Sequence, residues 1–317
     1  MLKMILNRIA WAFATLFFVS IIIFVAIEAL PGDMATAYLG RDATPESLAF
    51  YREEFGLNRP LFVRYFEWFA GVIRGDFGTS PLREEPITEL IKFRLRNTVV
   101  LGLSAAVIGI PLAIFLGIIT AINRDKYTDI FFSTLSLGLM TLPEFVIGTF
   151  LIFFLAIKFQ WLPAVALITT DAPIREIIPN ITLPIVTLTC VMVAHILRLV
   201  RTSLIDVMQS DFVVMAQFKG APKWRVILVH ALPNAMLPSI NIIALTVAWL
   251  LGGSVIIESM FNYPGIGSAM LVGITARDFM MVQAIAMALA IVYIGLNLTA
   301  DLLSLILNPR LRTSRIG

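Results

Sequence analysis

Apolar residues fall into six long stretches with polar connections between them. A membrane-spanning helix needs about 20 apolar residues, because a rise of about 1.5 Å per residue must cross a hydrocarbon core about 30 Å thick. The stretches of this length lie at residues 9–30, 98–121, 130–156, 184–207, 237–257 and 279–307. All six are predicted to be helical, because a backbone in lipid must satisfy its hydrogen bonds within its own segment. The pattern therefore predicts an all-α polytopic membrane protein with six transmembrane helices.

Two of the stretches have features that qualify this prediction. The first, residues 9–30, is longer than the apolar region of a secretory signal, which is about 7–15 residues, so we expect it to remain as the first span. The third, residues 130–156, is long and contains Pro143 near its middle. We therefore expect tilt or a kink there.

The orientation is predicted from lysine and arginine in the short connections, which favour the cytoplasmic side. With the N-terminus inside, the cytoplasmic pieces and span ends contain twelve basic residues: Lys3, Arg8, Arg124, Lys126, Arg198, Arg201, Lys219, Lys223, Arg225, Arg310, Arg312 and Arg315. The two short external loops contain Lys158, Arg175 and Arg277. The bias predicts an N-in/C-in topology, in which Arg198 and Arg201 act as orientation anchors.

The segment between the first two spans, residues 31–97, is predicted to be an external helical subdomain. Its aromatic residues are too numerous for a disordered linker. Thr44 followed by Pro45 is typical of a helix start, and we expect two or three short helices packed on the membrane face. The expected domains are residues 1–30 (N-terminus and first span), 31–97, 98–307 (transmembrane core with a cytoplasmic coupling loop at 208–234) and 308–317 (cytoplasmic tail).

Composition supports the membrane class and excludes several others. Hydrophobic residues make up 59% of the 317 residues and charged residues 14%, with a mean hydropathy of +0.90, whereas soluble domains average about 25% charged residues. The net charge of +3 includes no basic block, so nucleic acid is a poor candidate partner. The single Cys190 and the separated His195 and His230 argue against a redox, zinc or haem enzyme.

Among the polar residues inside the predicted spans, three lead to separate hypotheses. Glu144 near the middle of the third span must face a cavity or a partner, because a carboxylate in lipid is costly. It either lines a transport pathway or bonds a neighbouring helix, and the same two readings apply to His195. For Asp301, we expect a bond to another helix.

Small residues recur every fourth position in the second span: Ala105, Gly109, Ala113, Gly117 and Ala121. On a helix they form one smooth ridge that lets another helix approach closely. We expect this ridge to pack within the bundle rather than at a subunit interface.

The connection after the fourth span predicts a helix, a sharp turn and a second helix. Asp211 can cap the first helix, Gly220 can end it in a left-handed conformation, and Pro222 can open the next. Trp224 and other apolar residues of this loop suit docking into a partner's groove. The basic residues suit an interfacial helix on lipid equally well, so the residues alone leave both possibilities open.

The same loop resembles the cytoplasmic signature of ABC-importer permeases, in which EAA is followed by three residues, Gly, nine residues, Ile, one residue and Leu-Pro. Ala216, Gly220 and the pair Leu232-Pro233 fit this pattern, whereas Val214, Met215 and His230 depart from it. The departures resemble the dipeptide/oligopeptide/nickel branch. Further stretches similar to that branch are Leu30-Pro31-Gly32-Asp33, Gly56-Leu57 with Pro60-Leu61 and Tyr65, Gly75-Asp76-Phe77-Gly78 with Ser80, Glu258 with Phe261, Pro264, Gly265 and Gly267, and Asn308-Pro309 with Leu311-Arg312.

The resemblance implies a transport subunit rather than an enzyme, in the bacterial inner membrane. It implies four partners: a second homologous permease, two ATPase subunits below the membrane, and an external substrate-binding protein. ATP and Mg²⁺ would act on the ATPase subunits, and this chain has no G-x-x-x-x-G-K-[ST] phosphate loop of its own. The residues implied to couple to the ATPases are Asp211, Ala216, Lys219, Gly220, Pro222, Trp224, Arg225, Leu232 and Pro233.

Three other classes compete with this interpretation. An ion-coupled secondary transporter would usually show inverted repeats, an intramembrane enzyme would need paired catalytic groups, and a membrane scaffold would not require the Gly220 turn. The cargo stays open among dipeptides, longer peptides, glutathione-like peptides, opines and nickel chelates.

Overall fold

The computed structural model describes residues 2–40, 43–252 and 255–307. Within these residues nearly all regular structure is helical, with one short antiparallel hairpin of β1 (Thr79–Ser80) and β2 (Glu85–Pro86). The long helices are α1 (Leu2–Glu28), α5 (Ile87–Ile122), α6 (Tyr127–Thr141), α9 (Thr182–Met208), α12 (Leu232–Leu251) and α15 (Phe279–Leu307). The shorter ones are α2 (Met34–Leu39), α3 (Pro45–Glu54), α4 (Leu61–Arg74), α7 (Glu144–Leu151), η2 (Ile152–Lys158), α8 (Ile174–Asn180), α10 (Asp211–Phe218), α11 (Lys223–Arg225), η3 (Val226–Ala231), α13 (Val255–Met260) and α14 (Ile266–Ala276).

Four helices are long and apolar enough to cross a membrane unaided: Lys3–Glu28, Ile87–Ile122, Thr182–Met208 and Phe279–Thr299. Two bent helix pairs, Tyr127–Thr141 with Glu144–Lys158 and Lys223–Met236 with Pro238–Leu251, pass the same test when each is taken as one span. The chain is therefore a polytopic helical membrane protein with four to six candidate spans.

The expected kink in the third stretch is a complete break. The two halves of residues 130–156 meet at 110°. Leu142 adopts an extended conformation with ψ of 134°, and Pro143 becomes the residue before α7. The physical reason is that proline lacks an N–H and disfavours helical geometry in the residue before it.

The second stretch also differs from its prediction, because α5 begins at Ile87 rather than near residue 98. Its 36 residues make a rod of about 54 Å at 1.5 Å per residue, longer than a hydrocarbon core. Its first turns bury Ile87 and Ile91 against Ile266 of α14 and Met281 of α15. This packing extends the helix through residues 87–97, which the sequence assigned to the external segment.

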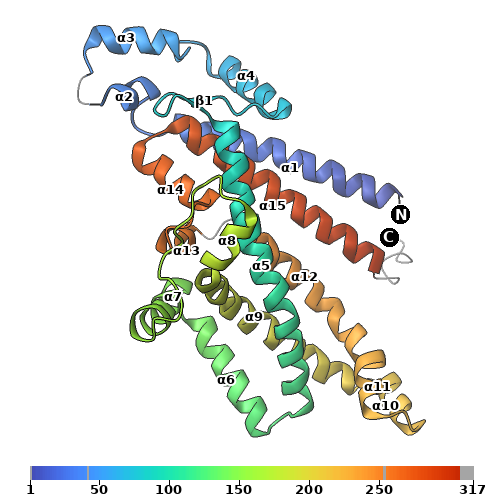
Figure 1. Ribbon diagram of the computed structural model, residues 1–317. Helices are drawn as coiled ribbons and strands as arrows, with labels where there is room; N and C mark the ends of the chain where they lie inside the picture. The colour runs from blue at the N-terminus through green and yellow to red at the C-terminus, as the bar shows by residue number, and fades with distance from the viewer. Residues whose placement is uncertain (1, 41–42, 253–254, 308–317) are drawn as a thin grey trace.

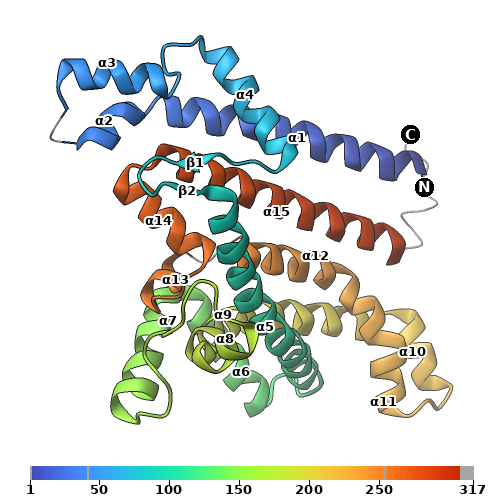
Figure 2. The ribbon, with the colours of Figure 1, turned by 45° about the horizontal axis from the view of Figure 1, so that its top comes forward.

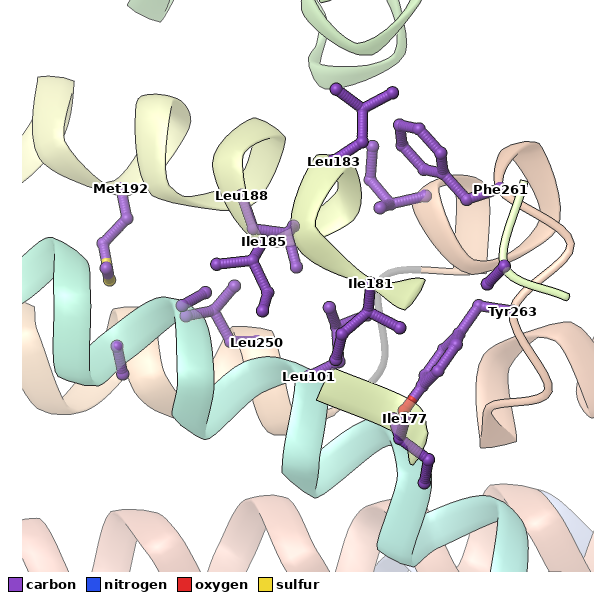
Figure 3. Packing of buried hydrophobic residues seen from close by; sticks show 14 of the residues in the cluster. Leu101, Ile177, Ile181, Leu183, Ile185, Leu188, Met192, Leu250, Phe261 and Tyr263 are labelled. Carbon is purple, nitrogen blue, oxygen red and sulfur yellow. The ribbon is translucent and has the colours of Figure 1, made fainter. Parts of the chain in front are cut away.

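The main core surrounds α9, which lies between α5, α6 and α12 (Figure 1). Figure 3 shows Leu101 of α5, Ile185 and Leu188 of α9, and Leu250 of α12 pointing toward a common centre. Side-chain burial here provides the main stabilisation of the bundle interior through close packing.

The small-residue ridge of α5 faces α9, as expected for packing within the bundle. Ala105 and Ala113 are fully buried. A Cβ atom at Gly109 would overlap Met192, and one at Gly117 would lie 2.8 Å from Val200 Cβ. The ridge therefore sets the distance between the two central helices.

The external segment contains three short helices, α2, α3 and α4, and Thr44 caps α3 as its sequence predicts. The aromatic face of α4 packs against α1: Tyr65 bonds Ser20 (2.8 Å between the hydroxyl oxygens), and Phe69 meets Phe17 edge to face. Because Phe17 lies near the middle of α1, α4 packs along the C-terminal half of that helix rather than standing clear of it.

Helices α1 and α15 run side by side (Figure 2), and α15 also packs against α12. Arg8 forms an ion pair with Asp301 between them, which confirms the expectation that Asp301 bonds another helix. The motif at residues 308–312 lies outside the described residues, as do Arg310, Arg312 and Arg315. The short helices α10 and α11 lie at the opposite end of the molecule from α2 and α3 (Figures 1 and 2).

Candidate functional site

The connection between α9 and α12 folds as the helix–turn–helix that its sequence predicts. Helix α10 ends at Phe218, and Gly220 adopts a left-handed conformation with φ of +75°. The Gly220 N–H donates to Gln217 O (2.9 Å) and the Ala221 N–H donates to Ala216 O (3.2 Å). These two bonds satisfy carbonyls at the end of α10, as in a Schellman motif.

The start of α10 differs from the prediction, because Asp211 is its first helical residue rather than its cap. Ser210 occupies the N-cap position, and its hydroxyl donates back to Val207 O (2.5 Å) instead of capping the helix. Asp211 still places a negative charge in the first turn, where it suits the helix dipole.

The second helix begins at Lys223, directly after Pro222 as expected, and continues into the π-helical η3. Leu232 and Pro233 then open α12. Pro233 has no N–H to donate to a carbonyl in the preceding turn, which loosens the helical ladder at this point. One continuous helical arm thus runs from the Gly220 turn into α12.

The helix pair has one buried side and one exposed side. Val213, Val226 and Ala231 are buried with Leu204 of α9 and Ala235 of α12. This cluster fixes the pair to the C-terminal end of α9 and the N-terminal end of α12. A displacement of the pair therefore moves α9 and α12, because close-packed contacts transmit strain.

The exposed side is apolar and basic at once. Phe218 is 82% exposed and Trp224 63% exposed, on either side of the Gly220 turn. Met215, Leu228 and Val229 extend this apolar surface. The neighbouring basic residues Lys219, Lys223 and Arg225 are exposed too. Large apolar side chains grouped this way mark an interaction surface.

A cluster of hydrogen-bonded polar groups, the Glu258 centre, lies at the other end of the bundle from the helix pair, around the buried carboxylate of Glu258 in α13. Thr98 of α5 donates its hydroxyl to Glu258 Oε1 (2.6 Å), and the Ser268 N–H donates to Oε2 (2.9 Å). Burial raises the pKa of Glu258 above its ordinary value, and these hydrogen bonds only partly oppose the shift. A Cβ at Gly265 would overlap the carboxylate, so this glycine leaves the space that the acid occupies.

Neighbouring bonds join three segments at this centre. Tyr263 donates its hydroxyl to Asn97 O (2.6 Å), and Asn97 Nδ2 donates to Pro264 O (2.9 Å) and to Thr170 O (3.0 Å). Arg96 adds a bond to Ala172 O (2.7 Å). The first turns of α5 are thereby fixed to the loop after α13 and to the loop before α8. Sequence reasoning quoted the Glu258 motif but assigned it no role, and it missed Thr98 and Asn97.

Two more of the stretches named from the sequence, those with Ser80 and Asp33, form specific contacts. Ser80 donates its hydroxyl to the buried Asp278, which also accepts the Met281 N–H at the start of α15. Asp33 caps α2 and accepts Arg52 Nε at 2.6 Å. Although burial opposes ionisation, the bonds from Thr36 and Arg52 outweigh it and lower the pKa of Asp33 below 3.8.

A buried ion pair that the sequence did not predict joins α6 to α9. Arg201 of α9 donates through Nε and Nη2 to both oxygens of Asp129 on α6 (2.5 and 2.6 Å). Asp129 also accepts the Asp125 N–H. Besides the orientation role predicted for it, Arg201 therefore fixes α6 to α9 through its guanidinium fork.

The two candidate pathway residues occupy different elements. Glu144 is half-buried in the first turn of α7, directly after the helix break. His195 lies at the midpoint of α9 and is exposed.

Comparisons with known proteins cover almost the entire chain. Residues 113–313 match the family model "Binding-protein-dependent transport system inner membrane component", and residues 1–102 match the N-terminal model of the same membrane component. A probable peptide ABC transporter permease protein of Sinorhizobium fredii is 33% identical over 308 residues, covering 97% of this chain and 98% of that protein. Glutathione transport system permease proteins of Shigella flexneri and Escherichia coli K12 are 31% and 30% identical over 312 residues, covering 98% of this chain and 99% of each protein.

Proposed function

Because the chain belongs to the family of binding-protein-dependent transport system inner membrane components, we propose that it forms, with a second homologous permease, a membrane pathway for peptides. It is a permease subunit of an ABC importer and not an enzyme, and it is a multi-pass protein of the bacterial inner membrane. The cargo is a peptide or a related small solute that an external substrate-binding protein delivers. The peptide and glutathione permeases among the relatives support this cargo class.

We propose six spans with both termini in the cytoplasm. The four unbroken candidate spans are the first, second, fourth and sixth, and the two bent pairs are the third and fifth. The twelve basic residues on the predicted inner side support this orientation. In this topology residues 31–97 and the Glu258 centre lie toward the outside, and the helix pair of residues 208–234 lies in the cytoplasm.

The observation that carries the coupling role is the exposure of Phe218 and Trp224 on a helix pair whose other side is packed into the core. An aromatic surface flanked by lysine and arginine fits a groove on a soluble partner. That partner is one of two ATPase subunits, which bind ATP and Mg²⁺ and supply the hydrolysis. The coupling residues are those of the loop, from Asp211 to Pro233.

ATP drives transport only if the ATPase subunits bind two permease conformations with different free energies. The helix pair contacts Leu204 of α9 and Ala235 of α12, and both helices extend into the main core around Leu188 and Leu250. Closure of the ATPase pair would therefore reach the pathway through two helices that are rigidly attached to the docking surface.

The test is a pull-down of the tagged chain from native membranes in mild detergent, with mass spectrometry of the proteins recovered. Trp224→Glu places a charge at the centre of the docking surface, and we expect it to release the ATPase subunits while the second permease stays bound. Trp161→Glu is the matched control, because Trp161 is at least as exposed (71%, compared with 63% for Trp224) but lies in the loop after η2. Recovery of the same partners with Trp224→Glu as with Trp161→Glu would reject the docking role. Recovery of the wild-type chain alone would reject the importer assignment.

A further inference from the structure

Helix α9 is the most enclosed of the four unbroken candidate spans, and the side chains that it exposes are polar. In its apolar window 67% of residues are buried, compared with 11% in α1. Four residues of α9 are exposed: His195, Arg198, Thr202 and Asp206. All four are polar, and α9, which is described in full, exposes no large hydrophobic side chain. We call these four residues the polar face of α9.

The other long helices expose apolar side chains, as expected of surfaces that meet lipid. Phe13 and Phe18 of α1 are 68% and 63% exposed, and Val107 and Phe115 of α5 are 72% and 60% exposed. Aliphatic and aromatic side chains are what the hydrocarbon core accepts, whereas polar side chains there are costly. The polar face of α9 therefore has the composition of a surface in contact with water.

The four residues form a single stripe along the helix. Their offsets of 0, 3, 7 and 11 residues, at about 100° per residue, place them within an arc of about 80°. His195 is the midpoint of α9, thirteen residues from Thr182 and thirteen from Met208. Arg198 lies about 4.5 Å further toward the coupling loop at 1.5 Å per residue. The stripe thus begins at the middle of the span and continues to its inner end.

The charge on Arg198 is not neutralised within the described part of the chain. Its neighbour Arg201 is held by both oxygens of Asp129, but no carboxylate of the described residues is paired with Arg198. A guanidinium carries five donors in a planar fork that matches a carboxylate. It is therefore available to an anionic group that enters from outside the chain.

We propose that the polar face of α9 lines the water-filled route of the importer and that Arg198 binds the carboxylate of the passing solute. This inference rests on the permease function proposed above and adds that the transported solute carries a carboxylate. A free carboxylate forms two charge-assisted bonds with the guanidinium, and the adjacent His195 and Thr202 present further polar groups on the same arc. An amidated C-terminus has no charge to offer and loses most of this interaction.

The first test asks whether the face is wet, independently of what is transported. Single cysteines replace Arg198, Thr202 or Val107 in a Cys190→Ala background, in the full importer during ATP turnover, and are treated with a membrane-impermeant thiosulfonate. We expect modification at positions 198 and 202 and none at position 107, which should face lipid. Equal protection at all three positions would overturn the proposal, whether lipid or the second permease covers the face.

The second test measures cargo discrimination in proteoliposomes with a panel of di- to tetrapeptides, each with a free or an amidated C-terminus. Arg198→Gln should lower uptake of the free acids by roughly ten- to hundredfold, as expected from losing a charge-assisted bond, and leave uptake of the amides nearly unchanged. Arg198→Lys should retain part of the preference. Since the binding protein is the same throughout, a changed acid-to-amide ratio originates in the permease.

A merely structural role for Arg198 would lower uptake of both peptide classes equally, and that result would overturn the proposal. If the wild-type importer transports no member of the panel, the proposed cargo class fails. The thiol modification still decides in that case whether the polar face of α9 is exposed to water.

Discussion

The left-handed turn at Gly220 offers the sharpest test of how the coupling loop is built. A Cβ added at this position meets no heavy atom within 4 Å, yet φ is +75°. Gly220→Ala therefore adds no steric clash with the surroundings, and its effect comes from the backbone alone. For a residue with a Cβ, the left-handed region costs about 1–2 kcal/mol.

That cost falls on the conformation that docks. The turn holds Phe218 and Trp224 on the same surface through the bonds to Gln217 O and Ala216 O. If the docking-ready turn loses about 1–2 kcal/mol, its population relative to alternatives falls by a factor of about 5–30. Binding of the ATPase subunits should weaken by up to the same factor, because a fractionally populated binding state lowers the apparent affinity. Gly220→Asn should weaken binding less, since asparagine tolerates this region better.

The assay is the dissociation constant of the ATPase subunits for the permease pair in nanodiscs. Gly138→Ala in α6 is the matched control, because its added Cβ also meets nothing within 4 Å but no positive φ applies there. We expect this control to bind as the wild type does. If Gly220→Ala matched Gly138→Ala, or if alanine and asparagine at position 220 were equivalent, the strained-turn argument would be refuted.

Three further predictions concern the polar contacts at the two ends of the bundle. Arg201→Ala should destabilise the protein by about 3–5 kcal/mol, because it leaves Asp129 buried without its partner. In a double-mutant cycle measured by thermal unfolding, adding Asp129→Asn should restore much of that loss. Simple additivity of the two changes would contradict the prediction. Glu258→Ala should lower the free energy of unfolding by about 1–3 kcal/mol, because it leaves buried donors unpaired. Glu258→Gln should lower it less, because the glutamine carbonyl still accepts a hydrogen bond. If both variants unfolded at the same midpoint as the wild type, these bonds would not be needed for stability. The pKa of Asp33 is lowered in the folded protein, so the stabilisation from its bonds is complete above pH 3.8 and is lost as the pH falls through the lower folded pKa. Protection of residues 33–39 from hydrogen exchange should therefore decrease in strong acid. Asp33→Asn should abolish that pH dependence.

The spans and the coupling turn were accessible from the sequence because their causes are local. Lipid requires long apolar helices, and proline and glycine restrict the backbone wherever they occur. Pro143 predicted an interruption and Gly220 a left-handed stop, and both are present. The size of the Pro143 bend was not accessible, because a proline kink and a full break have the same local sequence. The neighbours that α7 contacts, including Met260 near Gly148, decide between them.

The extension of α5 beyond the predicted span could not be predicted from the sequence for a related reason. Residues 87–97 contain three basic residues and one glutamate among apolar ones, and the charges make the segment read as one that lies in water. In the structure Ile87 and Ile91 reach α14 and α15, which lie some 180 residues later in the chain. Contacts this distant in sequence have no local pattern to reveal them.

By itself the sequence determined the membrane class, the helical character and the apolar–basic loop, because the bilayer and the backbone impose these on any short window of residues. Tertiary structure decided which polar residues are locked and which are available. Arg198 and Arg201 are three residues apart and chemically identical, but Arg201 faces Asp129 of α6 while Arg198 faces outward. Glu258 likewise became a buried anchor because Thr98 and the start of α14 converge on it. The pairing of charges depends on how helices are placed around one another, and that placement is a property of the whole packed bundle.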